Sequence, residues 1–292
     1  MEKNSIIECR GVSFTYGSGT PFEVRALDSV DLDIEKGLIT ALIGHTGSGK
    51  STLIQTLNAL IKPDSGKVLY EGADINANKA SARDVRFKVG LCFQYPEHQL
   101  FESTVYKDIA FGPKNMGLDE ASVDRNVRDA AALAGLDEEL FGKSPFELSG
   151  GQKRRAAIAG VMAMKPEVLI LDEPSAGLDP AGRRDTFDMI RRYREGTGKT
   201  VIIVSHSMDD VAELADRIAV VRRGKIAFYG TVDEVFSHSA EMAGMGLSVP
   251  EVTRITDALR AAGVPLKHGI YTLSEAAEEL IRCYRQKNGG RG

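Results

Sequence analysis

The chain has 292 residues, 42% of them hydrophobic, and is long enough for one large globular domain with a smaller appendage. Its formal net charge of −4 is spread along the sequence without a basic stripe, which argues against nucleic acid as a partner. The three cysteines, Cys9, Cys92 and Cys283, lack C-x-x-C spacing and predict neither a disulfide framework nor a zinc site, as is typical of a reducing cytosol.

The N-terminal segment has the alternating pattern of half-buried strands. Residues 6–16 alternate apart from one slip at Gly11, and Val30, Leu32 and Ile34 repeat the pattern. We therefore expect two antiparallel strands in this part of the chain.

A phosphate-binding loop follows. The stretch GHTGSGKST fits the pattern G-x-x-x-x-G-K-[ST], with an apolar strand pattern before it and a helical pattern after it. Its glycines let backbone amides turn toward a polyphosphate, Lys50 adds a positive charge, and the Ser51 hydroxyl is placed to ligate Mg²⁺. We predict that nucleotide is bound by Gly44, His45, Thr46, Gly47, Ser48, Gly49, Lys50, Ser51 and Thr52.

Two residues at strand ends extend this expected site. Tyr16 ends the first strand within reach of the nucleotide, and we interpret it as the platform for adenine; a strand-end core tyrosine is the alternative. Gln94 leaves a strand expected over residues 88–93, and we interpret it as a sensor of the γ-phosphate or Mg²⁺ rather than a solvated side chain.

Helical periodicity replaces the strand patterns over residues 104–165, as between the capping Asp119 and the terminating Gly135. We expect a helical subdomain inserted into an α/β core. It ends in a second glycine-rich turn that feeds a helix N-terminus, an anion-binding arrangement without a lysine. The residues are Ser149 as the helix cap, Gly150, Gly151 and Gln152, and a simple N-cap turn is the alternative interpretation.

Two carboxylates follow four apolar residues in the stretch 168–173, a pattern typical of a central strand whose end faces a ligand. We expect Asp172 to coordinate Mg²⁺ through water and Glu173 to polarise the attacking water. A β-branched strand over residues 200–205 closes in His206. In a parallel sheet this position lies on the ligand side, so we expect a contact with the γ-phosphate rather than a structural role.

In this order, the motifs resemble the ATP-binding cassette (ABC) family over residues 5–235. In that family's terms, 44–52 is similar to Walker A, Gln94 to the Q-loop and 148–152 to the signature LSGGQ. Walker B is matched by 168–173, the D-loop by 175–179 with Ser175 for the more usual threonine, and the switch histidine by His206. The resemblance implies an ABC-type P-loop NTPase core with an antiparallel β edge, and two cassettes packed head to tail with the signature of one closing over ATP on the other.

A narrower resemblance, to the ATPase (A) subunits of energy-coupling factor transporters, comes from residues 93–101 and 107–113, and GHTGSGKST points to the second of their two paralogues. It implies ATP hydrolysis that drives uptake of vitamins or transition-metal ions. The implied partners are a second ATPase subunit, identical or paralogous, an energy-coupling transmembrane subunit and substrate-binding membrane subunits. Because no stretch of about 18 apolar residues occurs, we expect peripheral binding at the cytoplasmic face of the membrane. We expect the segment Tyr95 to Phe101 to dock a helix of a membrane partner; the alternative is that its aromatic residues anchor the helical subdomain to the core.

The expected domains are a cassette over 1–235 and a small helical appendage over 236–292. Ser248 with Glu251 and Thr272 with Glu275 have capping-box spacing. The resemblance implies that the appendage helps two ATPases pair; a satellite core packed on its own cassette is the alternative. The alternative functions are the ATPase of another ABC importer and a soluble ABC ATPase acting on nucleic acid or ribosomes.

Overall fold

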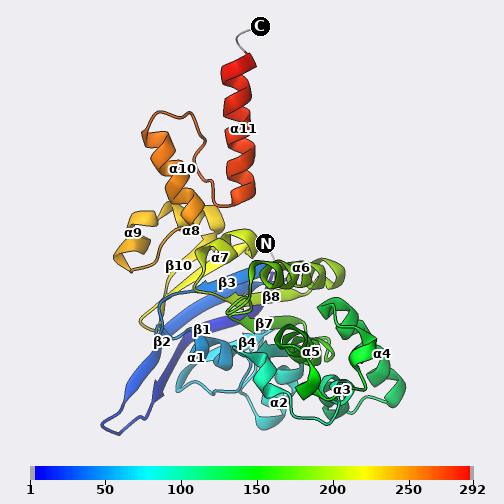
Figure 1. Cartoon of the computed structure of the whole chain (residues 1–292). Helices are drawn as coiled ribbons and strands as arrows, with labels where there is room; N and C mark the ends of the chain where they lie inside the picture. The colour runs from blue at the N-terminus through cyan, green and yellow to red at the C-terminus, as the bar shows by residue number, and fades with distance from the viewer. Residues whose placement is uncertain (1–3, 290–292) are drawn as a thin grey trace.

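The architecture is a parallel-sheet core with an antiparallel sheet on one side, a helical block on another and a C-terminal appendage, as a computed structural model describing residues 4–289 shows (Figure 1). The main sheet has the strand order β10-β9-β3-β8-β7-β6. Its strands are β3 (Ile39–Ile43), β6 (Val89–Cys92), β7 (Val168–Asp172), β8 (Thr200–Val204), β9 (Arg217–Arg222) and β10 (Lys225–Thr231).

The centre of the main sheet is parallel and buried on both faces. β3 pairs in parallel with β8 and β9, and β7 pairs in parallel with β6 and β8. Every residue of β3 and β8 is buried, which explains why both read as continuous apolar or β-branched runs. The register places Leu42 and Asp172 on either side of Val204, so the carboxyl ends of β3, β8 and β7 meet at one edge.

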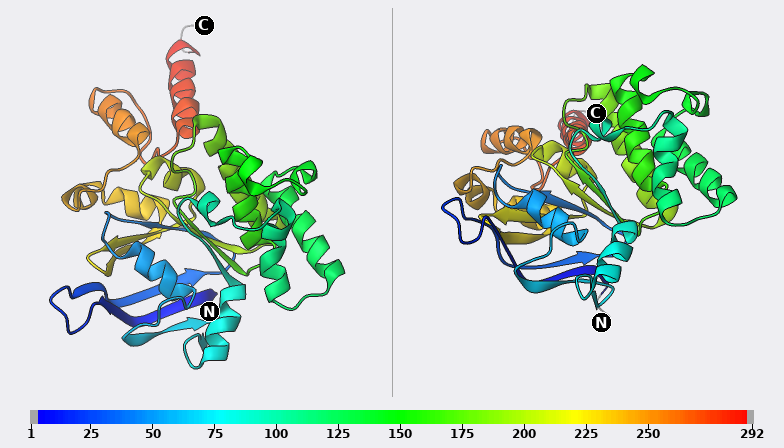
Figure 2. Two further views of the ribbon diagram at one scale, coloured as in Figure 1. Left: turned by 60° about the horizontal axis from the view of Figure 1, so that its bottom comes forward. Right: turned by 90° about the horizontal axis from the view of Figure 1, so that it is seen from below.

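The expected antiparallel strands form the second sheet, in the order β2-β1-β4-β5. Its strands are β1 (Ser5–Tyr16), β2 (Val24–Glu35), β4 (Ser65–Tyr70) and β5 (Ala73–Asp74). One hydrophobic cluster joins this sheet, helix α1 (Lys50–Leu57) and one face of the main sheet, for example through Val30, Leu53 and Ile202. Figure 2 shows these blue strands and the green helical block on different sides of the main sheet.

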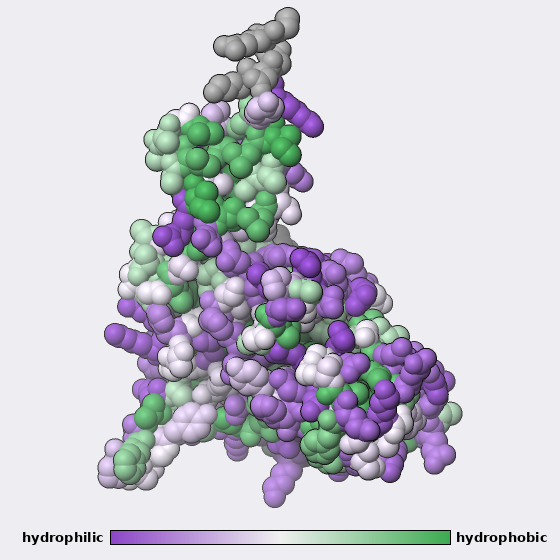
Figure 3. All heavy atoms as spheres, in the orientation of Figure 1, coloured by the Kyte–Doolittle hydropathy of each residue, from purple (hydrophilic) through white to green (hydrophobic). Residues whose placement is uncertain are grey.

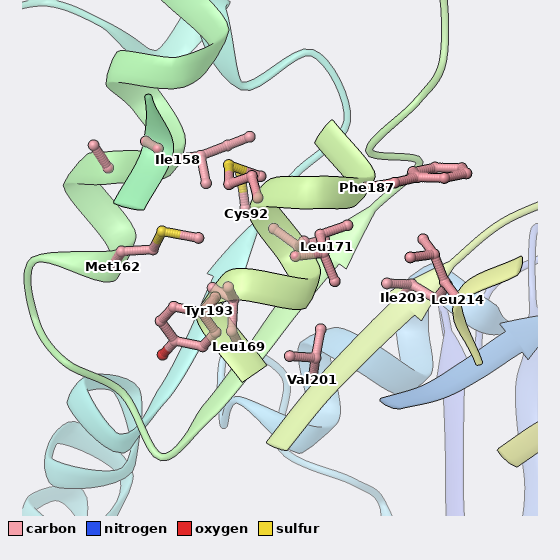
Figure 4. Packing of buried hydrophobic residues seen from close by; sticks show 14 of the residues in the cluster. Cys92, Ile158, Met162, Leu169, Leu171, Phe187, Tyr193, Val201, Ile203 and Leu214 are labelled. Atoms are coloured by element: carbon pink, nitrogen blue, oxygen red, sulfur yellow. The ribbon is translucent and has the colours of Figure 1, made fainter. Parts of the chain in front are cut away.

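Helices cover the other face of the main sheet. The principal ones are α3 (Val105–Asn115), α4 (Glu120–Ala134), α5 (Gly150–Met162) and α6 (Pro180–Thr197), with short 3₁₀ turns at η1 (Pro96–Gln99), η2 (Glu138–Leu140) and η3 (Pro145–Glu147). Their buried residues form one cluster with the sheet, to which Cys92, Leu171 and Phe187 all belong (Figure 4). The caps expected for α4 are confirmed, because Asp119 accepts from the Ser122 amide and Gly135 is left-handed at φ +66°.

One helix of the core lacked a sequence signal. The strand expected over 88–93 begins only at Val89, because Lys88 ends helix α2 (Lys79–Lys88). Val85 is the one buried residue of α2, so this exposed helix has no apolar stripe to reveal it.

The C-terminal part contains α7 (Met208–Leu214), α8 (Val232–Ser237), α9 (Ser239–Gly244), α10 (Glu251–Ala261) and α11 (Leu273–Gly289). A small core of Val252, Leu266, Ile270 and Ala276 holds the appendage together. The capping box of Thr272 with Glu275 is confirmed, whereas the one expected for Ser248 with Glu251 is wrong. Pro250 is the N-cap of α10, and the Glu251 amide donates to Asp209 instead. Within residues 4–289, no helix combines the length and apolar character needed to cross a membrane.

Candidate functional site

The carboxyl ends of β3, β7 and β8 open into a cavity of about 690 Å³. Most of the residues singled out from the sequence line it, although they come from widely separated parts of the chain. They are Tyr16, Gly44, His45, Thr46, Gly47, Gly49, Lys50, Ser51, Thr52, Gln94, Asp172, Glu173 and His206. Ser48 lines an adjoining cavity of about 360 Å³ together with His45. The fold therefore assembles one site from the ends of parallel strands.

Two glycines of the phosphate loop are required by close packing. Gly49 is the N-cap of α1 at φ +108°, and a Cβ there would lie 2.4 Å from the carbonyl oxygen of Ala26. A Cβ on Gly44 would lie 2.2 Å from the carbonyl oxygen of Val221. The loop is thus wedged between β2 and β9, which holds the amino end of α1 toward the cavity.

Lys50 lies inside the loop. Its ammonium donates to the carbonyl oxygens of Gly44 at 2.6 Å and His45 at 3.0 Å. Burial lowers the pKa of Lys50, while the nearby carboxylates of Glu173 and Asp172 act to raise it. The lysine is therefore positioned between the loop and the acidic edge of the site.

Asp172 and Glu173 lie side by side at the end of β7. Burial, followed by the charge of Glu173, raises the pKa of Asp172 from 3.8 to about 6, although Lys50 opposes the shift. Glu173 has a left-handed backbone at φ +51°, rare for a residue with a side chain and typical of strained functional positions. Its Oε2 lies 2.8 Å from Nδ1 of His206.

The oxygen donors of this edge suit magnesium. Ser51, Gln94 and Asp172 line the same cavity and offer hydroxyl, amide and carboxylate oxygens. Among residues 4–289 no group of three or more His, Cys, Asp or Glu side chains is arranged to hold a metal ion. A single carboxylate with a hydroxyl is the donor set of Mg²⁺ bound together with phosphates and water, rather than of a metal held by protein alone.

Tyr16 lies at the rim of the cavity rather than in the core. Its side chain is 43% exposed, and its ring packs edge-on against Phe14 with 4.9 Å between centroids. Its hydroxyl lies 3.3 Å from Oγ1 of Thr52. An exposed ring face beside the phosphate loop is available for stacking.

The second glycine-rich turn lies outside this cavity. Ser149 caps α5, as expected from the sequence, and the structure adds a capping box with Gln152. A Cβ on Gly150 or Gly151 would meet nothing within 4 Å, so the turn is open to an approaching molecule. The amino end of α5 is therefore accessible from solvent.

Sequence reasoning missed two buried charged residues that brace the site. Arg154, on α5, donates to the carbonyl oxygens of Glu173 at 3.1 Å and Ala176 at 2.8 Å. Asp210, 4% exposed on α7, accepts from the hydroxyls of Ser175 and Ser207 and pairs with Arg183 at 2.7 Å. Neither had a signal, because an arginine or aspartate near a helix N-terminus usually lies in water.

The family is decided by the match of a family model described as "ABC transporter" to residues 27–176. The chain belongs to the ABC transporter family, in its energy-coupling factor group. The group follows from similar proteins named energy-coupling factor transporter ATP-binding protein EcfA2. The one from Caldanaerobacter subterraneus subsp. tengcongensis is 50% identical over 279 residues, covering 96% of this chain and 98% of the relative. The one from Symbiobacterium thermophilum is 52% identical over 269 residues, covering 92% of this chain and 93% of the relative.

Solved structures of ABC proteins agree with this placement. The structure of cbiO1 from Clostridium perfringens, described as part of the ABC transporter complex cbiONQ, superposes with a TM-score of 0.74 at 35% identity, covering 88% of this chain and 99% of that one. An ATP-binding cassette solved as a dimer in a post-hydrolysis state with ADP and Pi gives a TM-score of 0.70 at 25% identity, covering 77% and 98%. The α/β cassette fold expected from the motifs is thereby confirmed.

Proposed function

We propose that this chain is the ATP-binding and hydrolysing subunit of an energy-coupling factor transporter, and that its ATP turnover energises uptake of vitamins or transition-metal ions. The observation that carries the proposal is the convergence of the phosphate loop, Gln94, Asp172, Glu173 and His206 on one cavity. The relatives at about half identity are named for ATP binding within such transporters, which favours this group over other ABC importers and over soluble ABC ATPases.

Each side chain has a role that follows from its place. The loop amides and Lys50 bind the phosphates of ATP, and Tyr16 stacks on the adenine. Ser51, Asp172 and Gln94 would hold Mg²⁺, which would neutralise charge on the β- and γ-phosphates. Glu173 accepts the proton of the attacking water, and His206, 2.8 Å away, holds that carboxylate and contacts the γ-phosphate.

A second cassette completes the site. Ser149, Gly150, Gly151 and Gln152 do not line the cavity of their own chain, and their turn is exposed. In a head-to-tail pair they close over ATP held by the partner, which is an identical or a paralogous chain. The amino end of α5 then contributes its positive dipole to the partner's γ-phosphate.

The segment Tyr95 to Phe101 docks a cytoplasmic helix of a membrane subunit. Phe101 is 61% exposed, and its ring packs edge-on against exposed Phe111 with 5.0 Å between centroids. Leu100 differs, because it packs against the main hydrophobic cluster and anchors the segment. Exposed aromatic side chains next to Gln94 suit a protein interface that follows changes at the nucleotide.

We keep the division into a cassette over 1–235 and an appendage over 236–292 as a proposal, since α8 spans the boundary. Figure 3 shows apolar side chains gathered over the appendage, and the exposed ones are Ile255, Leu273, Leu280, Ile281 and Tyr284. A second ATPase subunit covers this surface. The assembled chain lies at the cytoplasmic face of the membrane, bound to its energy-coupling and substrate-binding subunits.

The test combines activity with assembly. The purified chain, alone or with its co-expressed partners, should release phosphate from ATP in a Mg²⁺-dependent manner, and Lys50→Ala should abolish this. Membranes solubilised in detergent should yield hydrophobic subunits together with the tagged chain, and these can be identified by mass spectrometry. Recovery of ribosomes or nucleic acid instead, with no membrane protein, contradicts the proposed transport function.

A further inference from the structure

The chain between α9 and α10 passes over the phosphate loop, although 200 residues separate the two in sequence. Nε2 of His45 lies 2.5 Å from the backbone carbonyl oxygen of Met245. Because a carbonyl only accepts, Nε2 carries the proton and donates, which sets the orientation of the imidazole. We call residues 245–250 the linker.

The next residue of the linker packs against the same ring. Gly246 has φ +69°, and a Cβ there would lie 2.6 Å from Nε2 of His45. The linker backbone therefore approaches the imidazole more closely than a side chain at this position permits. Gly244, two residues earlier, has open space where a Cβ would be placed.

The linker also forms part of the wall of the nucleotide cavity. Gly246, Leu247 and Ser248 line the 690 Å³ cavity together with the phosphate loop and the catalytic candidates. On the other side, Met245 and Leu247 line the adjoining cavity with His45 and two arginines, Arg222 and Arg223. A nucleotide whose phosphates lie on the loop therefore has the linker as a neighbour.

Both ends of the linker are anchored near the site. The Leu247 amide donates to the carbonyl oxygen of Met242 at 2.9 Å, and Met242 is completely buried in the main core. At the far end, the Glu251 amide donates to Oδ1 of Asp209 at 3.2 Å, three residues beyond His206. The linker thus runs from the phosphate-loop side of the cavity to the switch-histidine side.

We propose that the linker is a structural part of the ATP site, which positions His45 over the phosphate loop and slows the release of bound nucleotide. The inference rests on the proposed function and deepens it, because it makes the start of the appendage a neighbour of the phosphates. With the linker in place, nucleotide leaves only after the contact between His45 and Met245 opens. Occupancy of the loop is thereby transmitted to α10, whose first amide donates to Asp209, three residues beyond His206.

The test measures release of N-methylanthraniloyl-ADP from the full-length chain by stopped-flow fluorescence. Gly246→Ala forces Cβ against the imidazole and should accelerate release about threefold to tenfold, the effect of losing one hydrogen bond. Gly244→Ala, the matched control, should stay within about twofold of the parent. In a chain carrying His45→Ala, which releases faster by itself, adding Gly246→Ala should change the rate by less than about twofold, because the two act through one contact.

A second measurement needs no variant, and it tests the role of the linker even where Gly246→Ala folds poorly. Hydrogen exchange of the unmodified chain should slow in the peptide containing residues 245–250 when ADP is added, while exchange in α11 stays unchanged. Equal release rates for the parent and a folded Gly246→Ala chain overturn the inference, as does linker exchange that ADP leaves unchanged. Failure of the ATP site itself is distinguishable, because the parent and Lys50→Ala then bind the fluorescent nucleotide equally poorly.

Discussion

Nδ1 of His206 lies 2.8 Å from Oε2 of Glu173, and this contact joins the ends of two neighbouring parallel strands, β8 and β7. The Glu173 side chain is 12% exposed, whereas that of His206 is 73% exposed. Both side chains line the nucleotide cavity, and the histidine is the more accessible of the two. An arrangement of this kind orients a base toward a water molecule and keeps the histidine accessible to a phosphate.

Glu173→Gln should retain ATP binding and lose turnover by about 10² to 10⁴, since the isosteric amide preserves packing yet accepts no proton. It should also stabilise the closed dimer. Steady-state phosphate release and size-exclusion chromatography with ATP measure the two effects. Turnover within about twofold of the parent contradicts the role of Glu173 as the base.

Ser175→Ala tests whether Asp210 positions the catalytic pair. The Ser175 hydroxyl donates to Asp210, which also accepts from Ser207, the residue after His206. Losing this hydrogen bond should lower kcat about threefold to tenfold with an unchanged KM for ATP, because the backbones carrying Glu173 and His206 are no longer held together.

The matched variant is Ser175→Thr, which keeps the hydroxyl and should retain kcat within about twofold. Thermal melting of both variants provides the control for folding. If a lower fraction of folded protein accounts fully for the loss of kcat in Ser175→Ala, the hydrogen bonds of Asp210 serve stability alone.

Ser149→Arg should inactivate a dimer while its own phosphate loop still binds nucleotide. Ser149 lies at the exposed amino end of α5, outside the cavity of its own chain. A bulky guanidinium there keeps two cassettes apart, and turnover should fall to the background of Lys50→Ala. Equilibrium binding of a fluorescent ATP analogue to the monomer checks the second half of the prediction, and lost binding indicates that the turn serves its own chain.

The raised pKa of Asp172 predicts a pH dependence of stability in the chain free of nucleotide and metal. The folded chain binds the proton more tightly than the unfolded chain, whose pKa is near 3.8. The stabilisation that comes from this tighter proton binding is fully present below pH 3.8 and is lost as the pH rises through about 6. Asp172→Asn should therefore melt at a higher temperature than the parent at about pH 8, and the difference should close toward about pH 5.

Melting curves recorded with a chelator at both pH values measure this difference. The exposed Asp84, changed to asparagine, serves as the control for removal of one negative charge. A difference between Asp172→Asn and the parent that is the same at both pH values contradicts the assignment.

Phe101→Ala combined with Phe111→Ala should leave folding and ATP binding intact and abolish recovery of membrane subunits with the tagged chain. Phe101 is 61% exposed and Phe111 45%, so truncating them removes less buried area than truncating a core residue does. Leu100→Ala is the contrasting variant, because this partly buried residue packs on the core and its truncation should lower the melting temperature. Normal recovery of the complex with both phenylalanines removed excludes docking through this pair.

The sequence by itself determined the features that depend on neighbouring residues. Three features carry their own local signal: the phosphate loop with its glycines and Lys50, the apolar run that ends in Asp172, and the caps of α4. The carboxyl ends of parallel strands share one edge of a sheet, which predicts that the phosphate loop and Asp172 lie close together. The structure places both in one cavity.

Only the tertiary structure decided which polar residues are buried and which distant segments touch. Arg154 and Asp210 look like solvated helix residues in sequence, yet both are at most 5% exposed, and both form hydrogen bonds with the turn that follows β7. Leu100 and Phe101 are adjacent and similar in sequence, but one packs on the core and the other faces solvent. The contact of His45 with Met245 has no local signal at all, since it arises only when the segment after α9 returns to the loop that follows β3.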